Sequence, residues 1–311
     1  MRKLSESFLN DLKDIGGLLH PILERVKQDH TLMIAIRDNY INIYYRGGNL
    51  LMIKEQDKGS YQSSFDLNYN IFEKNIPDTP KVINSQDGAK KWVEAFPHLK
   101  EMMDFYFSKN SKPEREFQQL VARENNYSTI SNESEYFFPD IEFADSDLGA
   151  RFDMLAIRWL ATKRKNGSTC QAAFIEMKYG DGALGGTAGL IKHIKDFDDL
   201  IRDSKRYATL LKTMEAQFNQ LLELGLLKFN QCSNGTKVKL NAEDKPEVIF
   251  LLSNHNPRSP KLKTMLNDPV NDIDKYGSSE HFDLRFFVSS FAGYGFHSGN
   301  MRTLDQFREL L

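Results

Sequence analysis

Two carboxylates and one ammonium group lie close together in the stretch 151–180, RFDMLAIRWLATKRKNGSTCQAAFIEMKYG, whose pattern predicts two strands joined by a basic turn. Asp153 opens the first strand, and period-2 alternation places Glu176 and Lys178 side by side on one face of the second. Burying all three groups is costly unless an ion or a ligand compensates their charges. Two carboxylates that converge beside a lysine suit a hard divalent cation held by oxygen ligands, with a substrate phosphate completing the shell.

The elements that must position these groups follow from hydrophobic periodicity. A helix start is indicated at Ser111 and Pro113, with acidic residues in the first turn. Glycine-rich residues 179–187 are expected to form a crossover near the site. The other elements are predicted from period-3.6 patterns and short apolar runs: helices at 112–125, 187–203 and 205–224, and strands at 133–144 and 248–252.

Arg-x-Asp at the start of one strand, followed by Glu-x-Lys on the next, resembles the PD-(D/E)xK phosphodiesterase superfamily, which has a restriction-endonuclease-like fold. The matching residues are Asp153, Glu176 and Lys178, and the resemblance covers residues 112 to about 254, under half of the chain. It implies an α+β or α/β fold with an αβββαβ core, in which helices flank a central mixed sheet. It also implies an enzyme, a metal-dependent nuclease that hydrolyses phosphodiester bonds of nucleic acid, DNA rather than RNA.

The resemblance assigns roles to these residues. Asp153, Glu176 and the backbone carbonyl of Met177 would hold Mg²⁺ or Mn²⁺ as the cofactor, which lowers the pKa of bound water. Lys178 would orient or help to deprotonate that water and offset charge on the phosphorane.

Many members of this superfamily place a glutamate on the helix before the sheet, aimed at the metal. Glu114 is the candidate for this catalytic role, because it lies nearer the apolar face of the helix than Glu116 does. Glu116 and Glu124 are alternatives, and an acidic residue that favours the helix dipole is the plain structural explanation.

A second aspartate competes for the metal. Pro139-Asp140 spells the "PD" of the motif within the preceding predicted strand. Asp153 is preferred, because it follows Gly149-Ala150 at a strand start and pairs naturally with the strand of Glu176.

Several basic residues are candidates for contact with nucleic acid. Lys163, Arg164 and Lys165 form the predicted hairpin tip, where they are solvated by default but would suit phosphate contact. Arg151 precedes the candidate aspartate. His193 lies four residues before an aromatic on the following helix, a spacing that some branches of the superfamily fill with other residue types. A structural histidine is the preferred interpretation, and contact with nucleic acid is the alternative.

The chain is expected to have two domains: residues 1–110 as an N-terminal accessory α+β domain, and 111–311 as the nuclease-like domain. The first begins with a helix at 4–28, which Pro21 would kink or divide, and continues as an antiparallel β-meander. Aromatic and arginine side chains on the meander could grip nucleic acid or simply cover the sheet: Arg37, Tyr40, Tyr44, Tyr45 and Arg46.

Composition restricts the other options. The chain is 40% hydrophobic and 27% charged, and a net charge of −2 excludes a globally basic nucleic-acid coat. No apolar run is long enough for a membrane span, so no membrane partner is expected. With only Cys170 and Cys232 there is no disulfide framework, and a cytoplasmic location is expected. A homodimer is compatible with the sequence. The alternative function is a catalytically silent nucleic-acid-binding or protein-interaction module on a nuclease-like fold.

Overall fold

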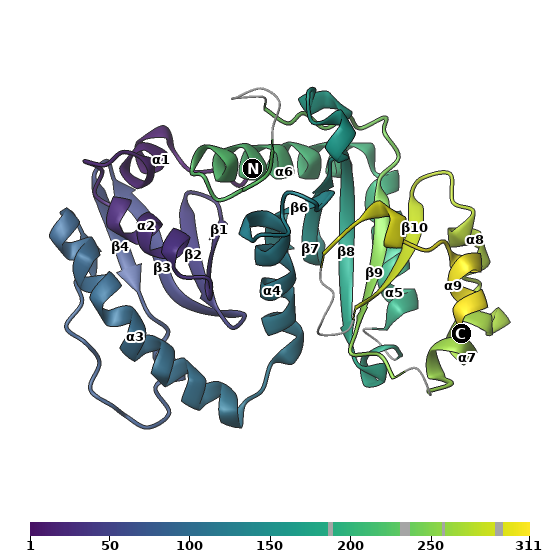
Figure 1. Ribbon diagram of the computed structural model, residues 1–311, viewed down its shortest axis with the longest axis horizontal. Coiled ribbons are helices and arrows are strands. Elements are labelled where there is room, and N and C mark those ends of the chain that lie inside the picture. Colours follow the sequence, from purple (N-terminus) through teal and green to yellow (C-terminus); the bar gives the residue numbers. More distant parts are fainter. Residues whose placement is uncertain (186–188, 231–236, 257–258, 290–294) are drawn as a thin grey trace. The chain divides into compact units, whose positions relative to one another are not determined.

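The protein has an α+β fold in a computed structural model that describes residues 1–185, 189–230, 237–256, 259–289 and 295–311 (Figure 1). The chain forms two compact units. The first comprises Met1–Leu120 and Ala216–Leu226, and the second comprises Val121–Glu215 and Leu227–Leu311. Each unit contains one five-stranded sheet. Among the described residues, no helix is long and apolar enough to cross a membrane.

The predicted domain boundary at residue 110 lies at the end of α3 (Gln86–Lys109). The two compact units divide instead within α4 (Pro113–Tyr127) and within α6 (Ser204–Glu223). A single cut of the chain would therefore not separate them, because residues 216–226 belong with the N-terminal unit.

The first unit contains the antiparallel meander that the sequence predicts. Its strands lie in chain order across the sheet: β1 (Leu32–Ile36), β2 (Tyr40–Tyr45), β3 (Gly48–Asp57), β4 (Ser60–Ser64) and β5 (Val82–Ile83). The helix predicted at 4–28 is in fact two helices, α1 (Glu6–Lys13) and α2 (His20–Gln28). The break falls at Asp14, whose backbone is extended, and Pro21 lies in the first turn of α2, where proline is well tolerated.

The turn between β2 and β3 shows why the meander's basic and aromatic residues serve the fold. Arg46 bonds the carboxylates of Asp104 and Glu116, and the hydroxyl of Tyr45 donates to Asp104 at 3.0 Å. Gly47 has φ +73°, and a Cβ there would lie 2.4 Å from the backbone of Arg115, so only glycine fits. Two of the side chains proposed to grip nucleic acid, Tyr45 and Arg46, are therefore engaged within this unit at this turn.

The second unit contains a mixed sheet with strand order β10-β9-β8-β7-β6. Strands β6, β7 and β8 are antiparallel, whereas β8, β9 and β10 are parallel. The strands are β6 (Tyr136–Asp145), β7 (Ala150–Arg158), β8 (Gln171–Tyr179), β9 (Glu247–Ser253) and β10 (Asp283–Ser289). The helices of this unit are the C-terminal part of α4, α5 (Leu190–Arg202), the N-terminal part of α6, α7 (Lys261–Asn267), α8 (Asp274–Gly277) and α9 (Leu304–Leu310). Along the chain the order is therefore α4, β6, β7, β8, α5, α6, β9.

Sequence determines two features of this sheet directly. Every residue of β9, EVIFLLS, is buried, as the continuous apolar run predicts for a strand with parallel neighbours on both sides. Pro139 interrupts the pairing of β6 with β7, where the register shifts between Phe137 and Asp140, because proline cannot donate to the ladder.

Cys170 is a buried free thiol, and Cys232 lies outside the described residues.

In the connection between β7 and β8, one of the three basic residues predicted to be solvated is buried. Arg164 is 2% exposed, and its guanidinium donates to the backbone carbonyls of Trp159, Asn132 and Ser134. The guanidinium also stacks within 5.1 Å of the Phe137 ring. Burial lowers the pKa of Arg164. This arginine therefore fastens the connection to the unit, while its neighbours Lys163 and Lys165 are exposed.

Replacing Arg164 by alanine should destabilise the protein by about 3 kcal/mol, because three backbone carbonyls lose a charged donor and two of these hydrogen bonds are buried. Urea unfolding of the full chain measures this, with Lys163→Ala as the exposed control, which should change stability by less than about 0.5 kcal/mol. Equal effects of the two substitutions would contradict the structural role of Arg164.

Candidate functional site

Glu176 and Lys178 form a buried ion pair in the middle of the second unit's sheet. The Nζ atom of Lys178 lies 2.7 Å from Oε1 of Glu176, and the residues are 5% and 3% exposed. They lie on β8, the central strand, which pairs with β7 on one side and β9 on the other. The structure thus places a carboxylate and an ammonium on one strand face, as alternation predicts.

Asp153 reaches the same point from the neighbouring strand. The β7–β8 ladder ends at the pair Met154 and Ile175. One residue further on, Oδ2 of Asp153 accepts the backbone N–H of Met177 at 2.8 Å. A side chain thus replaces a ladder bond where the pairing ends, and it places the Asp153 carboxylate beside the residue that separates Glu176 from Lys178.

The backbone opposite Asp153 is strained. On β6, Ile141 pairs with Met154 and Phe143 pairs with Phe152, so Glu142 lies across from Asp153. Glu142 has φ +50°, in the left-handed region that side chains other than glycine rarely adopt. Such strain costs on the order of 1–3 kcal/mol and is concentrated at functional sites.

His193 contacts this group rather than being packed away from it. Its Nε2 lies 3.0 Å from Oε1 of Glu176, the same oxygen that pairs with Lys178. His193 is on α5, whose buried residues Leu190, Ile194 and Phe197 hold the helix in place. Within the described part of the chain, Oε2 of Glu176 accepts no hydrogen bond.

The alternative aspartate lies elsewhere in the sheet. Asp140 is fully buried on β6 and pairs in register with Leu155 of β7. Strand β7 therefore separates Asp140 from β8, whereas Asp153 bonds β8 directly. Asp153 lies closer to Glu176 along the sheet, as the sequence argument prefers.

The helix glutamates are distributed over both units. Glu114 lies in the first turn of α4 within the first unit, so its candidate role stays a prediction. Glu116 accepts hydrogen bonds from Arg46 in that unit. Glu124 belongs to the second unit and pairs with Arg123.

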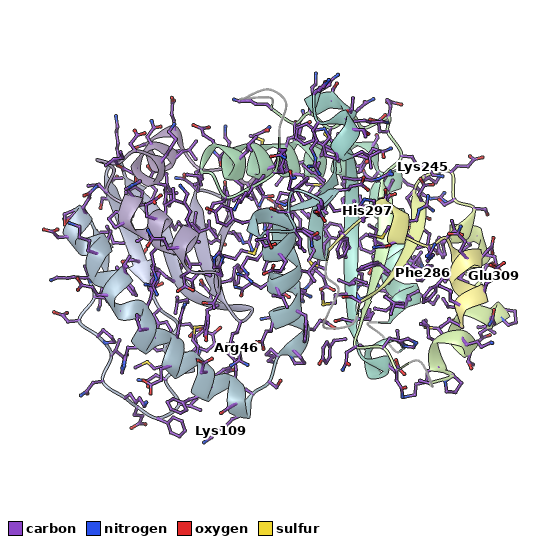
Figure 2. The ribbon with its side chains drawn as sticks, in the orientation of Figure 1. Arg46, Lys109, Lys245, Phe286, His297 and Glu309 are labelled. Atoms are coloured by element: carbon purple, nitrogen blue, oxygen red, sulfur yellow. The ribbon has the colours of Figure 1, made fainter. Side chains whose placement is uncertain are left out.

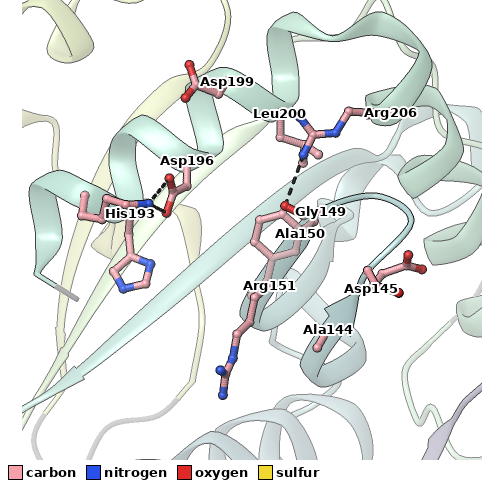
Figure 3. Close-up of a pocket in the computed structure, with 13 residues that line it drawn as sticks. Ala144, Asp145, Gly149, Ala150, Arg151, His193, Asp196, Asp199, Leu200 and Arg206 are labelled. Atoms are coloured by element: carbon pink, nitrogen blue, oxygen red, sulfur yellow. Dashed lines mark hydrogen bonds and ion pairs between the residues drawn. The ribbon is translucent and has the colours of Figure 1, made fainter. Parts of the chain in front are cut away.

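A pocket of about 840 Å³ adjoins the site, between the β6–β7 turn and α5 (Figure 3). Arg151, Phe152 and His193 line it, and the side chains of Arg151 and His193 extend toward the same side in the close-up. His193 therefore belongs both to the pocket and to the contacts of Glu176. Of the residues proposed to contact nucleic acid, Arg151 and His193 lie at the pocket.

The structure contains a histidine–aspartate pair that was not predicted from the sequence. Asp181 lies in a short 3-10 turn (Asp181–Ala183) just after β8, and its Oδ1 lies 2.7 Å from Nδ1 of His255, just after β9. Burial alone would raise the pKa of Asp181, but hydrogen bonds from Ser259 and His255 hold it below the usual value. Parallel pairing of β8 with β9 could have indicated this contact, because it brings together the residues that follow the two strands.

Residues 186–188 of the predicted crossover lie outside the described residues.

The metal-ligating potential of the site consists of two carboxylates and a carbonyl. In the ranges that the structure describes, no three His, Cys, Asp or Glu side chains are grouped to hold a metal ion. The residues that could contribute oxygen ligands are Asp153, Glu176 and the backbone of Met177.

No protein-family model, curated protein or solved structure matches this chain.

Proposed function

We propose that the second unit is a Mg²⁺- or Mn²⁺-dependent nuclease of the PD-(D/E)xK type, with DNA as the expected substrate. One observation supports this more than any other. The buried Glu176–Lys178 pair and the Asp153 carboxylate converge on a single residue, Met177, at the point where two strands stop pairing. The choice of DNA over RNA follows from the resemblance alone.

The donor set suits the proposed ion. Mg²⁺ in phosphoryl-transfer sites is commonly held by one or two carboxylates together with waters and substrate phosphates, so a group of three acidic side chains is not required. Asp153 and Glu176 supply hard oxygen donors from adjacent strands, and the Lys178 and His193 contacts of Glu176 both fall on its Oε1 atom. When bound, the ion would polarise the scissile phosphate and acidify water.

The chain's own groups have distinct tasks in this proposal. Lys178 supplies a positive charge, held in place by Glu176, which offsets the negative charge that develops on the phosphorane. His193 orients the Glu176 carboxylate through its 3.0 Å contact. Glu176 and Lys178 are buried, so their charges lie in a low-dielectric environment, where preorganised charges act more strongly than in water.

The catalytic test uses nearly isosteric substitutions, because truncating one partner of a buried ion pair can unfold the protein. Asp153→Asn, Glu176→Gln and Lys178→Met should each lower Mg²⁺-dependent cleavage of labelled single- and double-stranded DNA by about a hundredfold or more. EDTA should abolish cleavage by the unmodified protein.

The matched control is Glu243→Gln, the same chemical change at an exposed position of the second unit, which should cut at the normal rate. Circular dichroism confirms that each variant is folded. Cleavage that survives in folded Glu176→Gln and Lys178→Met would refute the assignment. DNA binding without cleavage, unaffected by metal, would favour the silent binding module instead.

His193 should behave as a positioning residue. His193→Ala removes the contact with Glu176 and should slow cleavage about tenfold, whereas His193→Gln keeps a polar group there and should restore much of the rate. Lys195→Ala, an exposed neighbour on α5, is the control. Equal rates for His193→Ala and the unmodified protein would show that the contact has no role in the reaction.

A further inference from the structure

The pocket beside the candidate site has a fixed wall. Arg206 of α6 donates through Nε to the carbonyl of Leu148 at 2.7 Å and through Nη2 to that of Gly149 at 3.3 Å. These bonds hold the β6–β7 turn, which forms one side of the pocket (Figure 3). The opposite side is α5, and the ring of Phe152 forms part of the lining while it stacks on Phe197 of that helix, 5.2 Å between centroids.

The charges that line the pocket differ in how they are engaged. Lys192 is paired with Asp196, and Arg206 is occupied by the two carbonyls. Arg151 is exposed, and no carboxylate among the described residues forms an ion pair with it. Arg151 is therefore the cation of this pocket that can bind an anion without breaking an existing contact.

Basic and acidic side chains of the lining lie at different sides of the pocket. Arg151 and His193 extend toward the same side in the close-up, whereas the Asp199 carboxylate lies at the opposite side (Figure 3). The other carboxylates of the lining are Asp145, on the turn side, and Asp196, which is paired with Lys192. A ligand with one anionic end and one hydrogen-bond-donating end would match this distribution, since guanidinium groups bind phosphate and carboxylates accept from amino groups.

We propose that the pocket binds one nucleotide of the substrate, with its phosphate at Arg151 and its base toward Asp199. This inference rests on the proposed nuclease function and specifies the substrate contacts of the same site. A pocket of about 840 Å³ has room for a single nucleotide. Its carboxylates would repel a continuous run of phosphates, so the pocket accepts one nucleotide adjacent to the scissile bond rather than the extended backbone.

The test is calorimetric titration with 2′-deoxyadenosine 5′-monophosphate in EDTA, so that neither metal nor cleavage enters the result. Arg151→Gln should weaken binding about tenfold or more, because it removes a charge-assisted hydrogen bond. Binding of deoxyadenosine, which has no phosphate, should be the same in both proteins. The control is Arg202→Gln, the same change on α5 at a residue paired with Asp198 and outside the pocket lining.

The proposal is overturned if the unmodified protein binds none of the four deoxynucleoside monophosphates. It is also overturned if the Arg151→Gln variant binds them as tightly as the unmodified protein does. Either result can occur together with metal-dependent cleavage, in which case the nuclease assignment stands and the pocket assignment fails. Arg151-dependent nucleotide binding without any cleavage would support the pocket assignment and contradict the nuclease assignment.

Discussion

The burial of an ion pair in the middle of a sheet is the constraint on which the second unit depends. Glu176 and Lys178 are almost fully buried. Transfer of such charges out of water costs on the order of several kcal/mol of free energy per ion. Hydrophobic residues of similar volume would be cheaper at these positions. The sheet therefore retains a costly pair at the position where the β7–β8 pairing ends. A site that must hold charge in a fixed geometry explains this better than a stabilising role does.

The rest of the unit can be understood as support for that pair. Strands on both sides of β8 fix its backbone, and α5 brings His193 onto the carboxylate. Asp153 satisfies the N–H of Met177 where the ladder stops, and Glu142 opposite it adopts a strained backbone. Arg164 fastens the connection between the two strands that carry the charged groups. Figure 2 shows how densely side chains fill the space around these strands.

Local pattern was sufficient for most elements and for the placement of Glu176 beside Lys178. Alternation placed Glu176 and Lys178 on one face, and the apolar run of β9 predicted a buried parallel strand, because both signals depend on neighbours in sequence. The α+β class and the N-terminal meander were predicted in the same way.

Sequence reasoning failed where the deciding partner is distant along the chain. Arg164 looked like a solvated turn residue, because the three carbonyls that it satisfies depend on how the connection folds back. The contact of His255 with Asp181 spans 74 residues and requires the parallel register of β8 and β9. His193 lies at the margin of an apolar stripe in the sequence, and only the position of α5 on the sheet brings it into contact with Glu176.

Direct measurement of metal binding tests the central claim most sharply, because it needs no knowledge of the substrate. Titration with Mn²⁺ followed by electron paramagnetic resonance should reveal one bound ion per chain in the unmodified protein. That binding should be lost in both Asp153→Asn and Glu176→Gln and kept in Glu243→Gln. Mn²⁺ binding that both site variants retain, or no binding in the unmodified protein, would contradict the account.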